Sequence, residues 1–348
     1  MPRVIGIDPG TVSIDLCGLE DGRVFLDRSL PTAEALADPG AFVALLENAG
    51  PLDLIAGPSG YGLPLVRAQD ATDEQLRLAF LAAEGEPGGI GGLRTLARAL
   101  ARSALPVFFT PGVVHLASVP DHRKVNRVDM GTADKVCAAA LGVADQSQRF
   151  RCPPSETSFV LLELGGAFSA AVAVRDGRIV DGLGGTSGPI GWRSSGALDG
   201  EVAYLAGEVT KAMLFRGGAE SITEREPARR TVALDAFVEG ALKAARSLSV
   251  SLPAPREILV SGRALAEPGV GELLEPALAK LATAHRLRGF ARVAKAAAQG
   301  AAILADGLAG GRHRALVETM GIRGARGTLL DHLYVISRGQ ARRRLGLS

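Results

Sequence analysis

The stretch that decides the fold is SFVLLELGGAFSAAVAVRDGRIVD, residues 158–181. Two apolar runs flank the turn Gly165-Gly166, and Asp176-Gly177 separates the second run from a third. Apolar runs divided by glycine turns predict three antiparallel strands. An earlier stretch, RVIGIDPGTVSIDLCGLEDGRVFLD, residues 3–27, has the same order and also begins its third run with arginine. The repeat predicts two lobes that are copies of one unit.

The size and charge of the chain narrow the class of protein. A chain of 348 residues suits two domains. Lys and Arg number 39 against 37 Asp and Glu, so the net charge is +2. A net charge this small does not attract nucleic acid or an anionic membrane to the molecule as a whole. The sequence has no secretory pattern at its start and no apolar run of about 18 residues. We therefore expect a cytoplasmic protein with neither nucleic acid nor membrane as a partner.

The remaining segments predict how the lobes are divided. Helical spacing is found at 33–47, 93–103, 131–143, 198–214, 232–248 and 293–308, and short strands are expected at 53–57, 106–110 and 256–260. The glycine-rich stretch 86–92 interrupts the first lobe, and a Gln-, Arg- and Pro-rich stretch, 146–156, is interpreted as the boundary between lobes. We expect an N-terminal lobe at 1–150, a nucleotide-binding lobe at 151–311, and a helical extension at 312–348 that packs back on the lobes.

The two glycine turns carry the first chemical prediction. A turn of glycine can press backbone N–H groups against a phosphate, because no Cβ stands in the way. Two such turns across a cleft could hold a triphosphate, and Asp8 could hold Mg²⁺ directly or through water. The alternative is a pair of ordinary hairpin turns, with Asp8 capping its own turn. The residues expected at the phosphates are Gly10, Thr11, Ser13, Gly165, Gly166 and Ser169.

Three motifs in order resemble those of the acetate and sugar kinase, heat-shock chaperone and actin superfamily. They are GIDPGT at 6–11, ELGGAFS at 163–169 and ILVSGR at 258–263. The resemblance implies an α/β fold of two duplicated ribonuclease-H-like lobes, the actin-like ATPase fold, with ATP and Mg²⁺ in the cleft. It also implies that Ser261, Gly262 and Arg263 lie under the nucleoside.

Within that superfamily the chain is most similar to the butyrate and acetate kinases. The similarity lies in residues 164–181, followed by GPIG at 188–191 and SSG at 194–196. Together with KVNRVDMGTADK at 124–135 and GTLLD at 327–331, it resembles an uncharacterised family labelled a predicted butyrate kinase, over nearly the whole chain. Asp8-Pro9 is closer to the first motif of sugar kinases and actin, so an alcohol acceptor is the alternative.

The acceptor side is predicted from two polar segments. By resemblance to butyrate kinase, Lys124, Arg127 and Asp129 are the candidates near the transferred phosphoryl group, against a solvated charged turn as the alternative. The loop 58–64 follows a short strand, and Ser59, Tyr61 and Arg67 could bind a hydroxyl or carboxylate; a plain surface loop is the alternative. Lys135 is expected on a domain surface, and Trp192 in a packing role.

We therefore predict an ATP-dependent phosphotransferase acting on a small metabolite, with a short-chain carboxylate as the first candidate acceptor. A sugar or polyol kinase would instead need a carboxylate such as Asp8, Asp15 or Asp129 as general base. Two other hypotheses use the same fold: an ATP-hydrolysing switch read by a partner protein, and a catalytically silent interaction protein. The resemblance also implies a homodimer. The three cysteines and five histidines lack metal-ligand spacing, so no zinc or histidine-built metal centre is expected.

Overall fold

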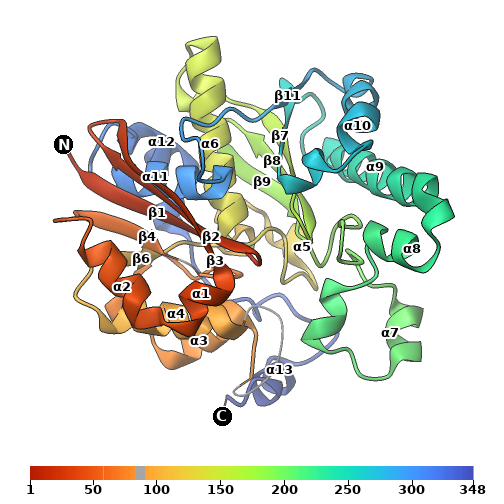
Figure 1. The fold of residues 1–348 in the computed structure, drawn as a ribbon, viewed down its shortest axis with the longest axis horizontal. Helices are drawn as coiled ribbons and strands as arrows, with labels where there is room; N and C mark the ends of the chain where they lie inside the picture. The colour runs from red at the N-terminus through yellow and green to blue at the C-terminus, as the bar shows by residue number, and fades with distance from the viewer. Residues whose placement is uncertain (58, 84–90, 348) are drawn as a thin grey trace.

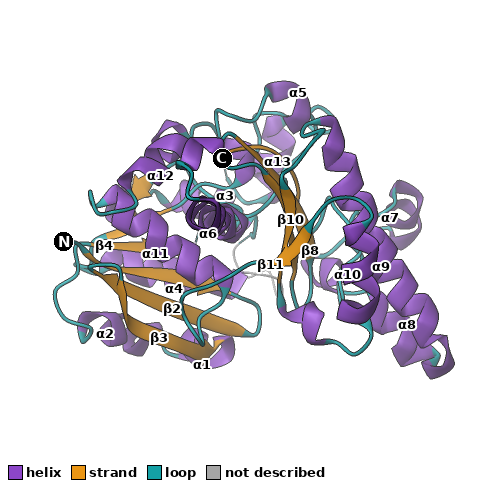
Figure 2. Cartoon of the chain, turned by 90° about the horizontal axis from the view of Figure 1, so that it is seen from above, coloured by secondary structure: helices purple, strands orange, loops and turns teal. Residues whose placement is uncertain are grey.

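The computed structural model describes residues 1–57, 59–83 and 91–347. Each half of the chain forms its own β-sheet, and helices pack on both faces of the sheets (Figure 1). Two long helices, α6 (Ala133–Phe150) and α11 (Ala296–Leu308), lie between the sheets (Figure 2). Pro58 and residues 86–90 of the predicted glycine-rich stretch lie outside the described residues.

The first sheet has the strand order β3-β2-β1-β4-β6-β5. Its first three strands form the antiparallel meander predicted for residues 3–27, and β1, β4 and β6 run parallel. The strands are β1 (Arg3–Pro9), β2 (Ser13–Glu20), β3 (Arg23–Pro31), β4 (Leu54–Gly57), β5 (Val66–Arg67) and β6 (Val107–Phe109).

The second sheet repeats this arrangement with the order β11-β10-β7-β8-β9. Its antiparallel and parallel pairs match those of the first sheet, and in both halves the pairing of the second and third strands shifts register once. The duplication of the lobes is thereby confirmed. The strands are β7 (Phe159–Leu164), β8 (Ser169–Arg175), β9 (Arg178–Leu183), β10 (Glu257–Ser261) and β11 (Ala284–Arg286).

Of the other helices, several cover the outer faces of the sheets, whereas α12 (Arg314–Met320) packs beside α6 and α11. Residues of α2 and α4 pack on the first sheet, and α9 and α10 pack on the second. These helices are α1 (Thr32–Ala37), α2 (Pro39–Glu47), α3 (Asp73–Phe80), α4 (Gly91–Arg102), α5 (Asp121–Lys124), α7 (Gly200–Ala206), α8 (Ala219–Arg225), α9 (Arg230–Ser247), α10 (Val270–Ala279), α12 (Arg314–Met320) and α13 (Arg338–Arg344).

Small residues let α6 and α11 pack closely against each other and against β1. A Cβ added at Gly300 of α11 would lie 1.7 Å from the carbonyl oxygen of Cys137 in α6, and one added at Gly6 would lie 2.2 Å from the backbone nitrogen of Ala302. One apolar core therefore runs from the first sheet through both helices to the second.

Alternation along β1 and β7 decides which side chains face this central layer. Val4 belongs to the core around α6 and α11, whereas Ile5 and Ile7 pack under the outer helices. In β7, Phe159 and Leu161 face the central layer. Because the side-chain period of a strand is two, the acids that continue these inner faces, Asp8 and Glu163, both project between the lobes.

Several predicted boundaries are wrong in detail. The helix α6 continues to Phe150, so the first part of the expected boundary, 146–150, is helical. The expected helix at 198–214 is a short helix, α7, followed by a separate 3₁₀ turn, Lys211–Phe215. The strand β8 begins at Ser169, so the turn at Gly165-Gly166 is a four-residue loop, 165–168. Neither β11 nor α10 is among the predicted elements: β11 is a strand of three mostly polar residues, and α10 contains Pro276, which disfavours a helix interior.

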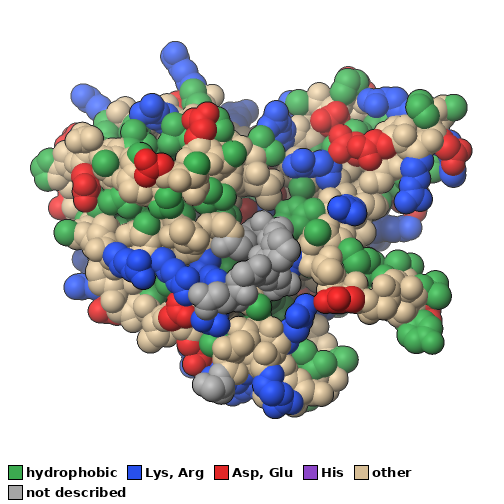
Figure 3. Space-filling view, turned by 60° about the horizontal axis from the view of Figure 1, so that its bottom comes forward, with side chains coloured by type: hydrophobic (Ala, Val, Ile, Leu, Met, Phe, Trp, Pro, Cys, Tyr) green, Lys and Arg blue, Asp and Glu red, His purple; other side chains and the backbone are tan. Residues whose placement is uncertain are grey.

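The surface agrees with the small net charge. On the face shown in Figure 3, Lys and Arg side chains are interspersed with Asp and Glu. At the end of the chain, Arg342 of α13 forms an ion pair with Glu74 of α3, and Leu345 packs against Leu78. Among the described residues, no helix combines the length and the apolar character that a membrane span requires.

Candidate functional site

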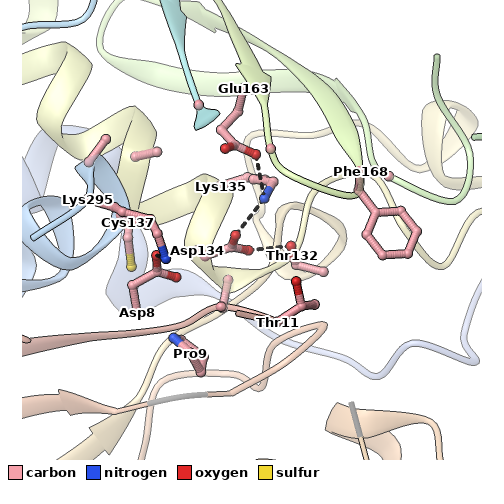
Figure 4. Close-up of a pocket in the computed structure, with 18 of the residues that line it drawn as sticks. Asp8, Pro9, Thr11, Thr132, Asp134, Lys135, Cys137, Glu163, Phe168 and Lys295 are labelled. Atoms are coloured by element: carbon pink, nitrogen blue, oxygen red, sulfur yellow. Dashed lines mark hydrogen bonds and ion pairs between the residues drawn. The ribbon is translucent and has the colours of Figure 1, made fainter. Parts of the chain in front are cut away.

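A cavity of about 580 Å³ lies between the two lobes. Its walls are the loop between β1 and β2, the loop between β7 and β8, the carboxyl end of β10, the start of α6, and the residues before α11 (Figure 4). In an α/β sheet the carboxyl ends of parallel strands are the usual place for a ligand site. The cavity therefore has the position at which this kind of fold binds small molecules.

The first glycine loop brings Asp8, Gly10 and Thr11 to the cavity. A Cβ added at Gly10 would lie 2.6 Å from the carbonyl oxygen of Ser13 and 2.9 Å from Lys295 Nζ, so the loop needs glycine there. Asp8 is only 7% exposed, and Lys295 Nζ lies 3.9 Å from its Oδ2. Burial raises the pKa of Asp8 to about 7, although the Lys295 charge opposes this shift.

The second glycine loop faces the first across the cavity. Gly165 and Gly166 both line the wall, and the Gly165 N–H donates to the carbonyl of Phe168 at 2.9 Å, which closes the loop. A Cβ added at Gly165 would lie 2.8 Å from that carbonyl, whereas one at Gly166 would meet only Arg263 Cδ at 3.7 Å. Gly166 thus leaves its backbone open to the cavity without being needed for the loop's shape.

The carboxyl end of β10 brings Ser261, Gly262 and Arg263 to another part of the wall. Gly262 has φ +112°, and a Cβ there would lie 2.1 Å from the carbonyl oxygen of Leu164. Glycine is required at this position, because L side chains rarely adopt this backbone conformation. The Ser261 hydroxyl is buried and has no hydrogen-bond partner among the described residues.

The centre of the cavity holds a lysine and two acids that we did not select from the sequence. Lys135 Nζ lies 2.5 Å from Asp134 Oδ2 and 2.8 Å from Glu163 Oε2, and Thr132 donates to Asp134. The side chain of Lys135 is only 12% exposed, so the expectation of a surface position is wrong. Burial alone would lower its pKa, but the Asp134 and Glu163 charges raise the pKa of Lys135 well above the ordinary value.

A polar group at another part of the wall contains two predicted residues, Asp129 and Tyr61. Asp129 accepts hydrogen bonds from the Thr186 N–H at 2.9 Å, the Thr186 hydroxyl at 3.0 Å and the Gly131 N–H at 3.2 Å. Burial raises the pKa of Asp129, and these bonds oppose the shift. Burial and the Asp129 charge raise the pKa of Tyr61. Ser59 also lines the cavity, but its hydroxyl donates to the Thr110 carbonyl at 2.8 Å.

Other predicted site residues lie outside the cavity lining. Lys124 is buried and donates to the Leu116 carbonyl at 3.2 Å, and burial lowers its pKa. Arg127 donates to the Ser187 carbonyl. Arg67 is stacked 5.8 Å from the ring centre of Phe108. Those predicted residues that do not line the cavity are Ser13, Arg67, Lys124, Arg127 and Ser169.

The residues that sequence reasoning missed share a structural relation. Glu163 lies two residues before the loop glycine Gly165, as Asp8 lies two residues before Gly10. Each acid faces a lysine from the other half of the chain, Lys135 or Lys295. The repeat itself contained the signal for Glu163, because aligning the two glycine loops equates it with Asp8. Nothing comparable in the sequence pointed to the lysines.

The arrangement suits a charged ligand that bridges the lobes.

Trp192 has the packing role that was expected of it. Its ring packs edge to face on Phe237 with ring centres 5.5 Å apart, and it does not line the cavity. Within the described ranges, no cluster of three or more His, Cys, Asp or Glu side chains could hold a metal by itself. A metal bound here would need ligands from a bound molecule as well.

Solved structures of acetate and propionate kinases share this fold. A propionate kinase from Francisella tularensis superposes with a TM-score of 0.58 at 13% identity, over 86% of this chain and 99% of that one. An acetate kinase from Entamoeba histolytica superposes with a TM-score of 0.56 at 10% identity, over 80% of this chain and 87% of that one. At such identities the likeness establishes the fold alone, which is the one that these acetate and propionate kinase structures have.

The chain belongs to the family described as "Protein of unknown function (DUF1464)", whose model matches residues 6–335. No curated protein matches the sequence. The family description states no activity, so the butyrate kinase label suggested by the sequence motifs stays a prediction.

Proposed function

We propose that the protein is an ATP-dependent phosphotransferase that acts on a small metabolite. The observation that carries the proposal is the pair of glycine loops, one from each lobe, that line a single cavity of about 580 Å³. Neither Gly10 nor Gly165 can carry a side chain in its loop. Backbone N–H groups without a neighbouring Cβ are suited to binding phosphate oxygens.

The charged groups of the cavity fit ATP with Mg²⁺. Mg²⁺ in nucleotide sites takes one or two carboxylates and completes its shell with phosphate oxygens and water. Asp8, Asp134 and Glu163 line the cavity and are the carboxylates that would hold it. Bound Mg²⁺ would supply neutralisation of the charge on the transferring phosphoryl group.

The chain's own residues would do the positioning. The two glycine loops would hold the phosphates from opposite sides, and Ser261 with Gly262 would lie under the nucleoside. Lys135 and Lys295 place positive charge in the cavity, which favours phosphate binding. Since the residues that line the cavity come from both lobes, closure of the lobes would exclude water during transfer.

The first candidate acceptor is a short-chain carboxylate, because structures that share the fold are acetate and propionate kinases. A carboxylate acceptor needs no general base. An alcohol acceptor is the second candidate, favoured by the buried carboxyls of Asp8 and Asp129 in the cavity wall. With its pKa near 7, Asp8 could accept a proton from a hydroxyl at neutral pH.

The test is a screen for phosphoryl acceptors with Mg²⁺ and ATP, in which ADP release is followed across short-chain acids, sugars and polyols. We expect one acceptor class to raise the rate far above the rate without acceptor. If ATP binds but no acceptor raises the rate, transfer to a small metabolite is refuted and a hydrolytic switch is favoured.

A matched pair of glycine variants ties the activity to the cavity. Gly166→Ala has room for its Cβ, so the fold should persist while the methyl group blocks close approach of a phosphate. We expect ATP affinity to fall at least about tenfold, measured by calorimetry. Gly200→Ala, where no atom lies within 4 Å of the added Cβ, is the control and should bind ATP like the original chain. Equal affinities in both variants would argue against phosphate contact at this loop.

A further inference from the structure

A second pocket of about 480 Å³ lies at the turn between β8 and β9. The turn supplies two arginines and one aspartate to its wall, and three hydroxyl residues from distant parts of the chain complete it. The residues that line it are Ser118, Ser155, Arg175, Asp176, Arg178, Val180 and Thr319. None of these residues lines the cavity between the lobes.

The two arginines are an unfavourable pair unless something neutralises them. Arg175 and Arg178 are directly opposite in the antiparallel register of β8 and β9, so their side chains leave the same face of the hairpin. Like charges in this position are destabilising. Within the described residues the side chain of Arg178 has no hydrogen bond or ion pair, and that of Arg175 makes a long hydrogen bond of 3.4 Å to the Ser251 carbonyl.

The equivalent turn of the first half shows that the fold does not require this pair. Asp21-Gly22 has φ values of +50° and +70°, and Asp176-Gly177 has +53° and +69°, so the two turns have the same backbone form. In the first half, however, the residues that flank the turn are Glu20 and Arg23, which have opposite charges. The two arginines are therefore a feature of the second turn alone.

We propose that this pocket binds the phosphate group of a small molecule, as free phosphate or as a phosphate monoester. Guanidinium groups match phosphate oxygens with paired hydrogen bonds, and two arginines against one aspartate leave the pocket net positive. The exposed Ser155 hydroxyl has no recorded partner in the described part of the chain and can donate as well. Ser118 and Thr319 donate to the Ile179 and Ala315 carbonyls and form the wall.

This site is separate from the cavity between the lobes. The strand β8 begins beside the second glycine loop and reaches the arginine turn after seven residues. At about 3.3 Å per residue the two ends lie on the order of 20 Å apart, which is too far for one phosphate group to contact both. The proposal therefore does not depend on the proposed kinase activity.

The test is calorimetric titration of the full chain with inorganic phosphate and, separately, with glycerol phosphate, against acetate at matched ionic strength. We expect the variant Arg175→Gln/Arg178→Gln to lose one phosphate site or to bind there at least about tenfold more weakly. The matched control is Arg23→Gln at the equivalent turn, which should titrate like the original chain. Stronger binding of one of the two phosphate compounds identifies the source of the group.

The outcomes separate the proposal from general attraction of anions. It is overturned if the original chain binds no phosphate, if the double variant keeps every site, or if Arg23→Gln loses as much binding. Thermal unfolding of each variant without phosphate checks that it is folded. Should the double variant unfold, Arg178→Lys gives the same test: it keeps the charge but loses the planar fork, and unchanged affinity in it would contradict recognition by paired hydrogen bonds.

Discussion

The two halves of the molecule have the same strand arrangement and the same acid–lysine pairing at the glycine loop, but the two pairs differ in distance and burial. In each half the last residue but one of the first strand is an acid, two residues before the loop glycine: Asp8 in β1 and Glu163 in β7. Each acid faces a lysine at the start of a helix of the other half or directly before it. Lys135 of α6 reaches Glu163, and Lys295, the residue before α11, reaches Asp8. The ion pairs therefore cross between the halves.

The crossed pairs differ in closeness. Lys135 is 12% exposed, lies 2.8 Å from Glu163 and also contacts Asp134. Lys295 is 40% exposed, lies 3.9 Å from Asp8, and donates instead to the Ser13 hydroxyl at 2.7 Å. The charges of Asp134 and Glu163 raise the pKa of Lys135 well above its ordinary value, whereas burial leaves Asp8 of the loose pair with a pKa of about 7. We infer that the close pair keeps a fixed positive charge on Lys135, whereas Asp8 in the loose pair can gain and lose a proton near neutral pH.

The largest effect is expected when the close pair is broken. Lys135→Met leaves the acids Asp134 and Glu163 without their cation in a buried site. Removing one partner of a buried pair costs about 3–5 kcal/mol of unfolding free energy, and ATP turnover should fall at least about 100-fold through lost charge stabilisation. Urea unfolding and ADP release measure the two effects.

The control for this variant is an exposed lysine in the same kind of pair. Lys243 lies 2.5 Å from Glu239 on α9, with both side chains mostly exposed. Exposed pairs contribute little to stability, so Lys243→Met should unfold and turn over like the original chain. Equal losses in the two variants would mean that burial does not distinguish Lys135.

An effect on the unfolding free energy that depends on pH is expected at Asp8. Its pKa of about 7 in the folded chain lies above the ordinary 3.8. The folded state thus holds the proton more tightly, so this carboxyl stabilises the fold below about pH 4 and loses that contribution as pH rises through 7. Asp8→Asn cannot ionise. Relative to the original chain it should gain unfolding free energy between pH 4 and pH 8, by about 1.4 kcal/mol for each unit of the shift.

Urea unfolding of both proteins across this range checks the prediction. A free-energy difference that does not change with pH would show that Asp8 titrates normally. If Asp8 is also needed in its ionised form for transfer, Asp8→Asn should lower the turnover about 100-fold or more above pH 7, and by less as the pH falls below 7, because Asp8 of the original chain is then itself protonated.

The glycine loops and the duplicated sheets could be predicted because their signals are local. Apolar runs separated by glycine turns predict two adjacent paired strands, and all of this signal lies within about ten residues of sequence. The positions of Asp8, Gly10 and Gly165 in the cavity follow from those elements. Ser261 and Gly262 were expected there from the resemblance of their motif, and they lie at the end of β10, which runs parallel to β7, and directly after it.

The lysines could not be predicted, because their roles depend on contacts between distant segments. Lys135 lies in the first turn of an alanine-rich helix, where a lysine is normally solvated. Only the packing of α6 between two sheets buries it beside Glu163, 28 residues away in sequence. Lys124 and Arg127, by contrast, were predicted at the site but lie outside the cavity lining. Their motif resembles a kinase segment, but the backbone there directs them to the Leu116 and Ser187 carbonyls.

The smallest effect is expected when the loose pair is broken. Lys295 is partly exposed and its carboxylate contacts are 3.5 and 3.9 Å long, so Lys295→Met should change the unfolding free energy by less than about 1 kcal/mol. Its charge nevertheless lowers the pKa of Asp8. Without that charge the pKa of Asp8 should rise, and any step that needs the ionised carboxylate should require higher pH. The pH profile of turnover measures this change: an upward shift of its acid limb would place the proton on Asp8, and an unshifted limb would assign it to another group.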